Sequence, residues 1–120
     1  KKSTFESLPR EIRTALYRVD EPETFSVERN RFDAITVLNK RISRVYKYVR
    51  KNKKNVALLE REIDNLIRLR DKKIAAPTPL NRTLLKGYDS VVLGYVDGEK
   101  LTMEQLDKAL DVYPMTRPPQ

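Results

Sequence analysis

No glycine or proline occurs between positions 23 and 76 of this chain. These residues are the strongest local signals for turns and helix ends, so a long stretch without them favours uninterrupted helix. Apolar residues recur within it at alternating steps of three and four, the spacing of one helix face, with Asn52 as the one polar residue on this seam. The seam comprises Ile35, Leu38, Ile42, Val45, Val49, Val56, Leu59, Ile63 and Leu66. The sequence therefore predicts a mostly α fold.

Two architectures fit the seam. One is a long helical hairpin over 26–75 that turns near 51–55, and the other is a single extended coiled-coil helix over about 27–75. Charge order favours the hairpin, because in each half acidic residues precede basic ones and so complement a helix macrodipole. Asn55 would then cap the second arm. The shared heptad phase favours the single helix, because hairpin arms need no common register. We take the hairpin as the first prediction.

The rest of the chain is expected to complete one helical domain over residues 1–120. A length of 120 residues is enough for one modest hydrophobic core. Two prolines at 77 and 79 end the long helical stretch, and an Asp-Gly pair at 97–98 signals a tight turn. The expected segments are a helix at 8–19, a loop with short elements at 76–101 that includes a small β-hairpin near 91–101, a helix at 103–112 and a tail at 113–120.

Histidine and cysteine are both absent. Their absence excludes Ser-His-Asp and Cys-His nucleophiles and the usual zinc clusters. No calcium loop or glycine-rich phosphate loop is present either. We therefore expect no enzyme activity, no metal, no cofactor and no small-molecule substrate. No apolar run reaches the roughly 18 residues that a membrane helix needs, and no signal peptide is evident, so we expect an intracellular protein without a membrane partner.

Residues 40–54 hold eight lysines and arginines and no acid. The other 17 basic residues balance the 17 acidic ones, so this segment accounts for the whole net charge of +8. On a helix its cations would form a stripe opposite the apolar seam, which suits contact with a phosphate backbone without sequence specificity. The predicted nucleic-acid ligands are Lys40, Arg41, Arg44, Lys47, Arg50, Lys51, Lys53 and Lys54.

Tyr46 and Tyr48 alternate with these cations. Tyrosine stacks on unpaired bases, but at the margin of the seam it also packs at the edge of a core, and we favour the packing interpretation. The first functional hypothesis is a non-catalytic domain that binds DNA or RNA within a multi-subunit assembly, and that is nuclear in a eukaryote. The alternative is a coiled-coil module that pairs with a protein partner or a second copy and has no nucleic-acid contact.

Overall fold

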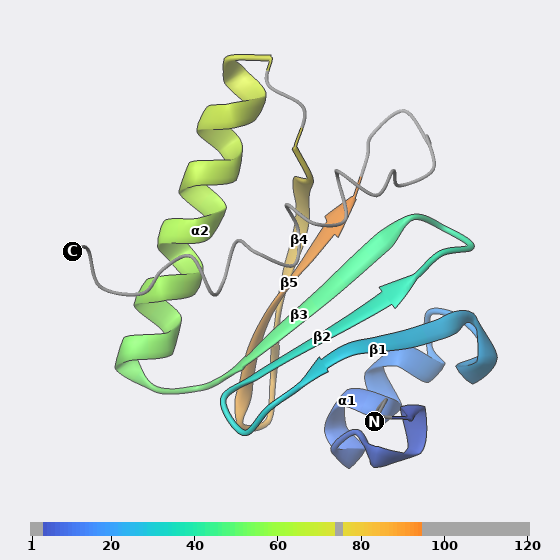
Figure 1. The fold of residues 1–120 in the computed structure, drawn as a ribbon. Helices are drawn as coiled ribbons and strands as arrows, with labels where there is room; N and C mark the ends of the chain where they lie inside the picture. Colours follow the sequence, from blue (N-terminus) through green and yellow to red (C-terminus); the bar gives the residue numbers. More distant parts are fainter. Residues whose placement is uncertain (1–3, 74–75, 95–120) are drawn as a thin grey trace.

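The computed structural model describes residues 4–73 and 76–94, which form a five-stranded antiparallel sheet with two α-helices (Figure 1). The strand order across the sheet is β1-β2-β3-β5-β4. In chain order the elements are a 3-10 turn (Phe5–Ser7), α1 (Arg10–Tyr17), a second 3-10 turn (Pro22–Thr24), β1 (Phe25–Asn30), β2 (Ala34–Asn39), β3 (Arg44–Arg50), α2 (Lys53–Asp71), β4 (Thr78–Leu85) and β5 (Tyr88–Gly94).

The predicted mostly α fold is therefore wrong, both as a hairpin over 26–75 and as one extended coiled-coil helix. Three strands occupy 25–50, and only the second arm of the expected hairpin is helical, as α2. The loop expected at 76–101 holds β4 and the whole of β5 instead. The expected helix at 103–112, the tail at 113–120 and the part of the β-hairpin beyond Gly94 lie outside the described residues.

The segments of β2 and β3 form strands because they are rich in β-branched and aromatic residues, which pack well on a pleated surface. Both strands lie inside the sheet, and every residue from 35 to 39 and from 45 to 49 is buried. Burial on both faces removes the alternation of apolar and polar residues that marks a half-exposed strand. The helix-like spacing of Ile35, Leu38, Val45 and Val49 thus arises from two strands that are buried on both faces.

The helices cover opposite faces of the sheet (Figure 1). On one face, α1 and the turn before it pack on an aromatic core, and on the other α2 packs on an aliphatic core. The aromatic core comprises Phe5, Leu8, Ile12, Leu16, Phe25, Val27, Ile35, Val37, Tyr46, Tyr48 and Tyr88. The aliphatic core comprises Leu38, Val45, Val49, Leu59, Leu66, Ala76, Val91 and Leu93, with Ile63 packed against it.

The seam is thus buried within this chain rather than against a second helix, and its residues are divided between elements. Ile35 belongs to the aromatic core and Leu38, Val45 and Val49 to the aliphatic one. Ile42 lies in the turn after β2, half-buried. In α2, the seam residues Leu59 and Leu66 belong to the aliphatic core and Ile63 packs against it, while Val56 is half-buried.

The turn between β2 and β3 reverses the chain without glycine or proline. Ser43 adopts the left-handed conformation, with φ of 54°, which glycine usually supplies. The side-chain oxygen of Asn39 accepts hydrogen bonds from the backbone N–H of Arg41 at 3.0 Å and of Ile42 at 3.3 Å. This local bonding satisfies the turn's backbone donors. Because this turn contains neither glycine nor proline, those two residue types could not predict it from the sequence.

A side-chain cap fixes the start of α2. Asn52 has an extended backbone, and its Oδ1 accepts a hydrogen bond of 2.8 Å from the backbone N–H of Asn55. Asn55, expected to be the cap itself, instead donates from Nδ2 to the carbonyl oxygen of Arg50 at 3.1 Å. These two bonds join the end of β3 to the first turn of the helix. The polar residue on the predicted seam is therefore the N-cap.

Replacing this cap tests the assignment. Asn52→Ala removes the acceptor for one orphan helix donor, and we expect it to lower the free energy of unfolding by about 1 kcal/mol. Asn52→Asp keeps an acceptor oxygen at the same position, so it should retain most of that stability. Urea denaturation of both variants measures the difference. Equal stability of Asn52→Ala and the unmodified chain would contradict the capping role.

Candidate functional site

The eight predicted phosphate ligands do not form one stripe. Lys40 and Arg41 lie in the turn before β3, with Arg44 at the first position of that strand. Arg50 ends the same strand, and the lysines at 51, 53 and 54 follow it into the first turn of α2. A strand rises about 3.3 Å per residue, so Arg44 and Arg50 are roughly 20 Å apart. The predicted helical stripe is therefore replaced by two clusters at opposite ends of β3.

Lys47, in the middle of β3, is buried, with a relative exposure of only 3%. Its Nζ lies 3.9 Å from Oε2 of Glu62, which comes from the middle of α2 and is 2% exposed. The side chains of β3 alternate between faces, so Lys47 shares the α2 face with Val45 and Val49. Lys47 and Glu62 thus form a buried ion pair between the sheet and the helix, and aliphatic side chains surround it.

Local sequence explains why this pair meets. Glu62 follows Leu59 by three positions and precedes Leu66 by four, so all three point from the same face of α2 toward the sheet. In the sheet, Lys47 pairs in register with Thr36 of β2 and Val91 of β5. Glu62 was not among the site residues predicted from the sequence. The signal available was an acidic residue at an apolar position of an amphipathic helix.

Arg41 is held by an acidic partner at the other end of the strand. Its Nε donates to Oδ2 of Asp20 at 2.6 Å, and Nδ2 of Asn39 donates to the same oxygen at 3.1 Å. The hydrogen bond from Arg41 is the largest cause that lowers the pKa of Asp20 to about 2, with smaller contributions from the Glu21 backbone N–H and Asn39. Arg41 therefore fastens the β2–β3 turn to the segment after α1.

Two further predicted ligands are also engaged within the chain. The guanidinium of Arg50 lies over the ring of Phe32, 4.4 Å from its centroid, and donates from Nε to the Phe32 carbonyl at 3.0 Å. The Tyr88 ring lies 5.3 Å away from the same group. Arg44 donates from Nη1 to the carbonyl oxygens of Ile42 and Ser43. Lys40, Lys51, Lys53 and Lys54 are exposed.

A second ion-pair network links α2 to the edge of the sheet. Arg82 of β4 forms a bidentate pair with Asp89 of β5 through Nε and Nη2, and its Nη1 lies 3.2 Å from Oε2 of Glu60. The Asp89 side chain is 2% exposed, so Arg82 compensates a buried carboxylate. These residues were not predicted from the sequence, because their contacts join three elements that are distant along the chain.

Tyr46 and Tyr48 lie on the α1 face, in the aromatic core. The ring of Tyr46 meets that of Phe25 edge to face, with centroids 6.0 Å apart. This placement agrees with packing, the interpretation favoured from the sequence, and both rings are too buried to stack on a base without rearrangement. Among the described residues, there is no group of three or more acidic side chains that could hold a metal ion. No helix of residues 4–73 or 76–94 is long and apolar enough to cross a membrane.

Comparison with known proteins finds no match to this chain among family models, curated proteins or solved structures.

The Asp20 carboxyl offers a direct test of the Arg41 contact. Its folded pKa of about 2 lies below the ordinary value of 3.8, so the contribution of this pair to stability is present above pH 3.8 and is lost as the pH falls toward 2. Arg41→Met should raise the pKa toward 3.8 and remove that pH dependence. Carboxyl chemical shifts followed by NMR titration measure both values. An unchanged Asp20 pKa in the variant would show that Arg41 is not the cause.

Proposed function

We propose that this sheet and helix bind the phosphate groups of a nucleotide through Lys47, with Glu62 as the residue that positions the Lys47 ammonium. The observation that carries the proposal is the buried ion pair between β3 and α2, 3.9 Å between Nζ and Oε2. The proposal differs from the sequence-based expectation that the chain has no small-molecule substrate.

Stability alone explains this pair poorly. Removing two charges from water costs several kcal/mol per ion, and a buried pair usually contributes no more than a well-packed apolar pair would. Lys47 lies among Val45, Val49 and Val91, so a methionine or leucine at this position would extend the aliphatic core without that cost. A buried charge pair in such surroundings is a candidate for a functional site, where the charge serves a ligand.

The order of the elements gives the proposal its chemistry. In protein kinases a lysine on the third strand contacts the nucleotide phosphates and forms an ion pair with a glutamate of the following helix. Here Lys47 is on the third strand, and Glu62 is on the helix that follows it. Those enzymes also cover the phosphates with a glycine-rich loop between the first two strands. This chain has Arg31, Phe32 and Asp33 there, so that contribution is missing.

The same face of the sheet carries a buried apolar row beside Lys47. Val45 pairs in register with Leu38 on one side and Leu93 on the other, which makes an apolar row across three strands. Lys47 is two residues further along β3 on the same face, roughly 7 Å from this row. A planar base resting on the row would bring its phosphates toward Nζ. Because these side chains are at most 3% exposed, the ligand enters only after the groups that cover them move.

Titration with MgATP tests the proposal. We expect the unmodified chain to bind, and Lys47→Met to weaken binding at least tenfold, because the variant loses a charge-assisted contact to phosphate. Glu62→Gln should also weaken it, through misplacement of the ammonium. The control Lys53→Met removes a lysine that is exposed and should leave the affinity within twofold.

Calorimetry gives the affinities, and circular dichroism shows whether each variant folds. Lys47→Arg provides a second variant that keeps the charge, and it should bind more tightly than Lys47→Met. Binding of MgATP by folded Lys47→Met as tightly as by the unmodified chain would refute the role of Lys47. Absence of binding to the unmodified chain at millimolar MgATP would refute the function itself. The proposal concerns binding alone, and the expectation from the sequence that the chain has no enzyme activity stays a prediction.

Exposed lysines support nucleic-acid binding as a second candidate function. Lys51, Lys53 and Lys54 lie together at the start of α2, are exposed, and form no ion pair within residues 4–73 and 76–94. Exposed, closely spaced cations release counterions from a polyanion when they bind it. DNA and RNA would be contacted without reading of sequence, because these lysines address phosphates rather than base edges.

Reversing these three lysines to glutamate should abolish binding to duplex DNA and to single-stranded RNA in a salt series. For the unmodified chain, the logarithm of the affinity for the duplex should fall with a slope near −0.9 per phosphate contacted. A matched control reverses the exposed Arg68, Arg70 and Lys72 at the far end of α2, with the same change in net charge. Equal loss in both variants would show that only net charge matters, and unchanged affinity in the first would exclude this cluster.

A further inference from the structure

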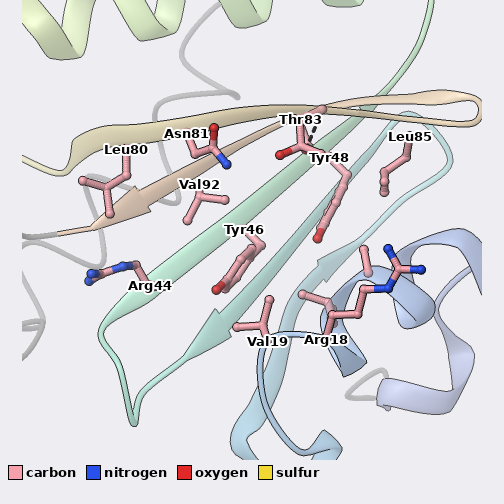
Figure 2. A pocket seen from close by; sticks show the side chains of 13 residues that line it. Arg18, Val19, Arg44, Tyr46, Tyr48, Leu80, Asn81, Thr83, Leu85 and Val92 are labelled. Carbon is pink, nitrogen blue, oxygen red and sulfur yellow. Dashed lines mark hydrogen bonds between the residues drawn. The ribbon is translucent and has the colours of Figure 1, made fainter.

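A groove of about 450 Å³ lies on the face of the sheet opposite α2, between α1 and strands β3, β4 and β5 (Figure 2). Its volume falls within the range of small-molecule sites, about 300–1,000 Å³. Apolar side chains from three elements line it, among them Leu16 of α1, Leu80 of β4 and Val92 of β5. Leu80 and Val19 at its margin are each about two-fifths exposed, which is high for apolar residues beside a core.

Two tyrosines of the aromatic core point their hydroxyl groups into this groove. Tyr46 is 7% and Tyr48 4% exposed, and their hydroxyl oxygens extend into the open space in Figure 2. Neither hydroxyl has a hydrogen-bond partner among the described residues. Neither oxygen is among the buried polar atoms that lack a partner, so both hydroxyls are open to the groove and available to a ligand. Burial raises the pKa of both phenols, so they remain neutral hydrogen-bond donors.

The charged side chains that line the groove are arginines. Arg18 and Arg44 are part of its wall, and no acidic residue is. Neither arginine forms an ion pair within the described part of the chain. The Ile42 and Ser43 carbonyls fix the Arg44 guanidinium at 3.0 and 3.2 Å. Arg44 and Tyr46 are two residues apart on β3, so both side chains lie on the groove face of the sheet. Burial is the largest cause that raises the pKa of the Tyr46 phenol; the charge of Arg44 opposes that increase, and the carboxylate of Asp20 adds to it.

We propose that this groove binds a small amphipathic organic anion. Its acidic head would lie between the Arg44 guanidinium and the Tyr46 hydroxyl, and its apolar body would lie against Leu80 and Val92. The head would accept a charge-assisted hydrogen bond from the arginine and a second bond from the phenol. The body would cover the apolar side chains at the margin. This site is on the opposite face of β3 from Lys47 and does not depend on nucleotide binding.

A matched pair of fluorescent probes separates the head from the body. 8-Anilinonaphthalene-1-sulfonate carries an anionic head, and N-phenyl-1-naphthylamine has the same ring system without it. We expect Arg44→Met to weaken the sulfonate at least tenfold and to change the affinity for the uncharged probe less than twofold. Tyr46→Phe, which keeps the ring and so the core, should weaken the sulfonate about threefold. Arg10→Met, an exposed arginine outside the groove, is the control and should change neither affinity.

Near-UV circular dichroism identifies any variant with lost packing, which would bind the sulfonate nonspecifically. If Arg44→Met is such a variant, Tyr46→Phe decides the result. Backbone NMR shifts on addition of the sulfonate should change along β3, β5 and α1. Equal sulfonate affinity in the unmodified chain and in both folded variants would overturn the proposal. Equal losses for the two probes, or shifts confined to α2, would also overturn it.

Discussion

The charge on Lys47 constrains the elements around it. An ammonium at the centre of an interior strand is stable only if a carboxylate reaches it, and Glu62 on α2 supplies that carboxylate. At 3.9 Å and an effective dielectric constant near 20, the attraction is about 4 kcal/mol. Desolvation of the two groups costs several kcal/mol each, so the pair contributes little net stability. Its effect is geometric, because α2 must present Glu62 to the sheet.

The two faces of the sheet carry different chemistry as a result. On the α2 face an ion pair lies among aliphatic side chains, and on the α1 face phenol and phenyl rings pack against one another, as Phe5 and Phe25 do at 5.7 Å between centroids. One proposed site is a buried cation, and the other is an open groove with fixed guanidinium and phenol donors. The sites share the backbone of β3 but none of its side chains, so substitutions in one can leave the other intact.

The two α-helices of the structure lie where the sequence carries local helical signals. Helical spacing and Leu59, Ile63 and Leu66 indicated the α2 segment, and α1 falls within the helix expected at 8–19. The region from 25 to 50 was mispredicted for two physical reasons. Ser43 makes a left-handed turn that carries no glycine signal, and burial of both faces of β2 and β3 conceals the period of two.

The candidate sites were predictable only in part. The basic segment was evident from composition, and Lys51, Lys53 and Lys54 are exposed as a polyanion contact requires. That Lys47 is buried could not be read from the segment, because Glu62 is fifteen positions away and meets it only through tertiary packing. The groove likewise combines α1 with three strands, and only the fold brings Arg44 and Leu80 together.

Alternation along β3 also determines how this strand can pair. A shift of one residue relative to β2 and β5 would send every side chain to the opposite layer. Lys47 would then enter the aromatic core beside Phe25, and Tyr46 and Tyr48 would be pressed against Leu59 beneath α2. The move of Lys47 is costly because its buried charge would lose the partner Glu62. The move of the two tyrosines is costly because their rings would overpack the aliphatic layer. The alternation of Lys47 with Tyr46 and Tyr48 thus fixes the register of β3 in the sheet.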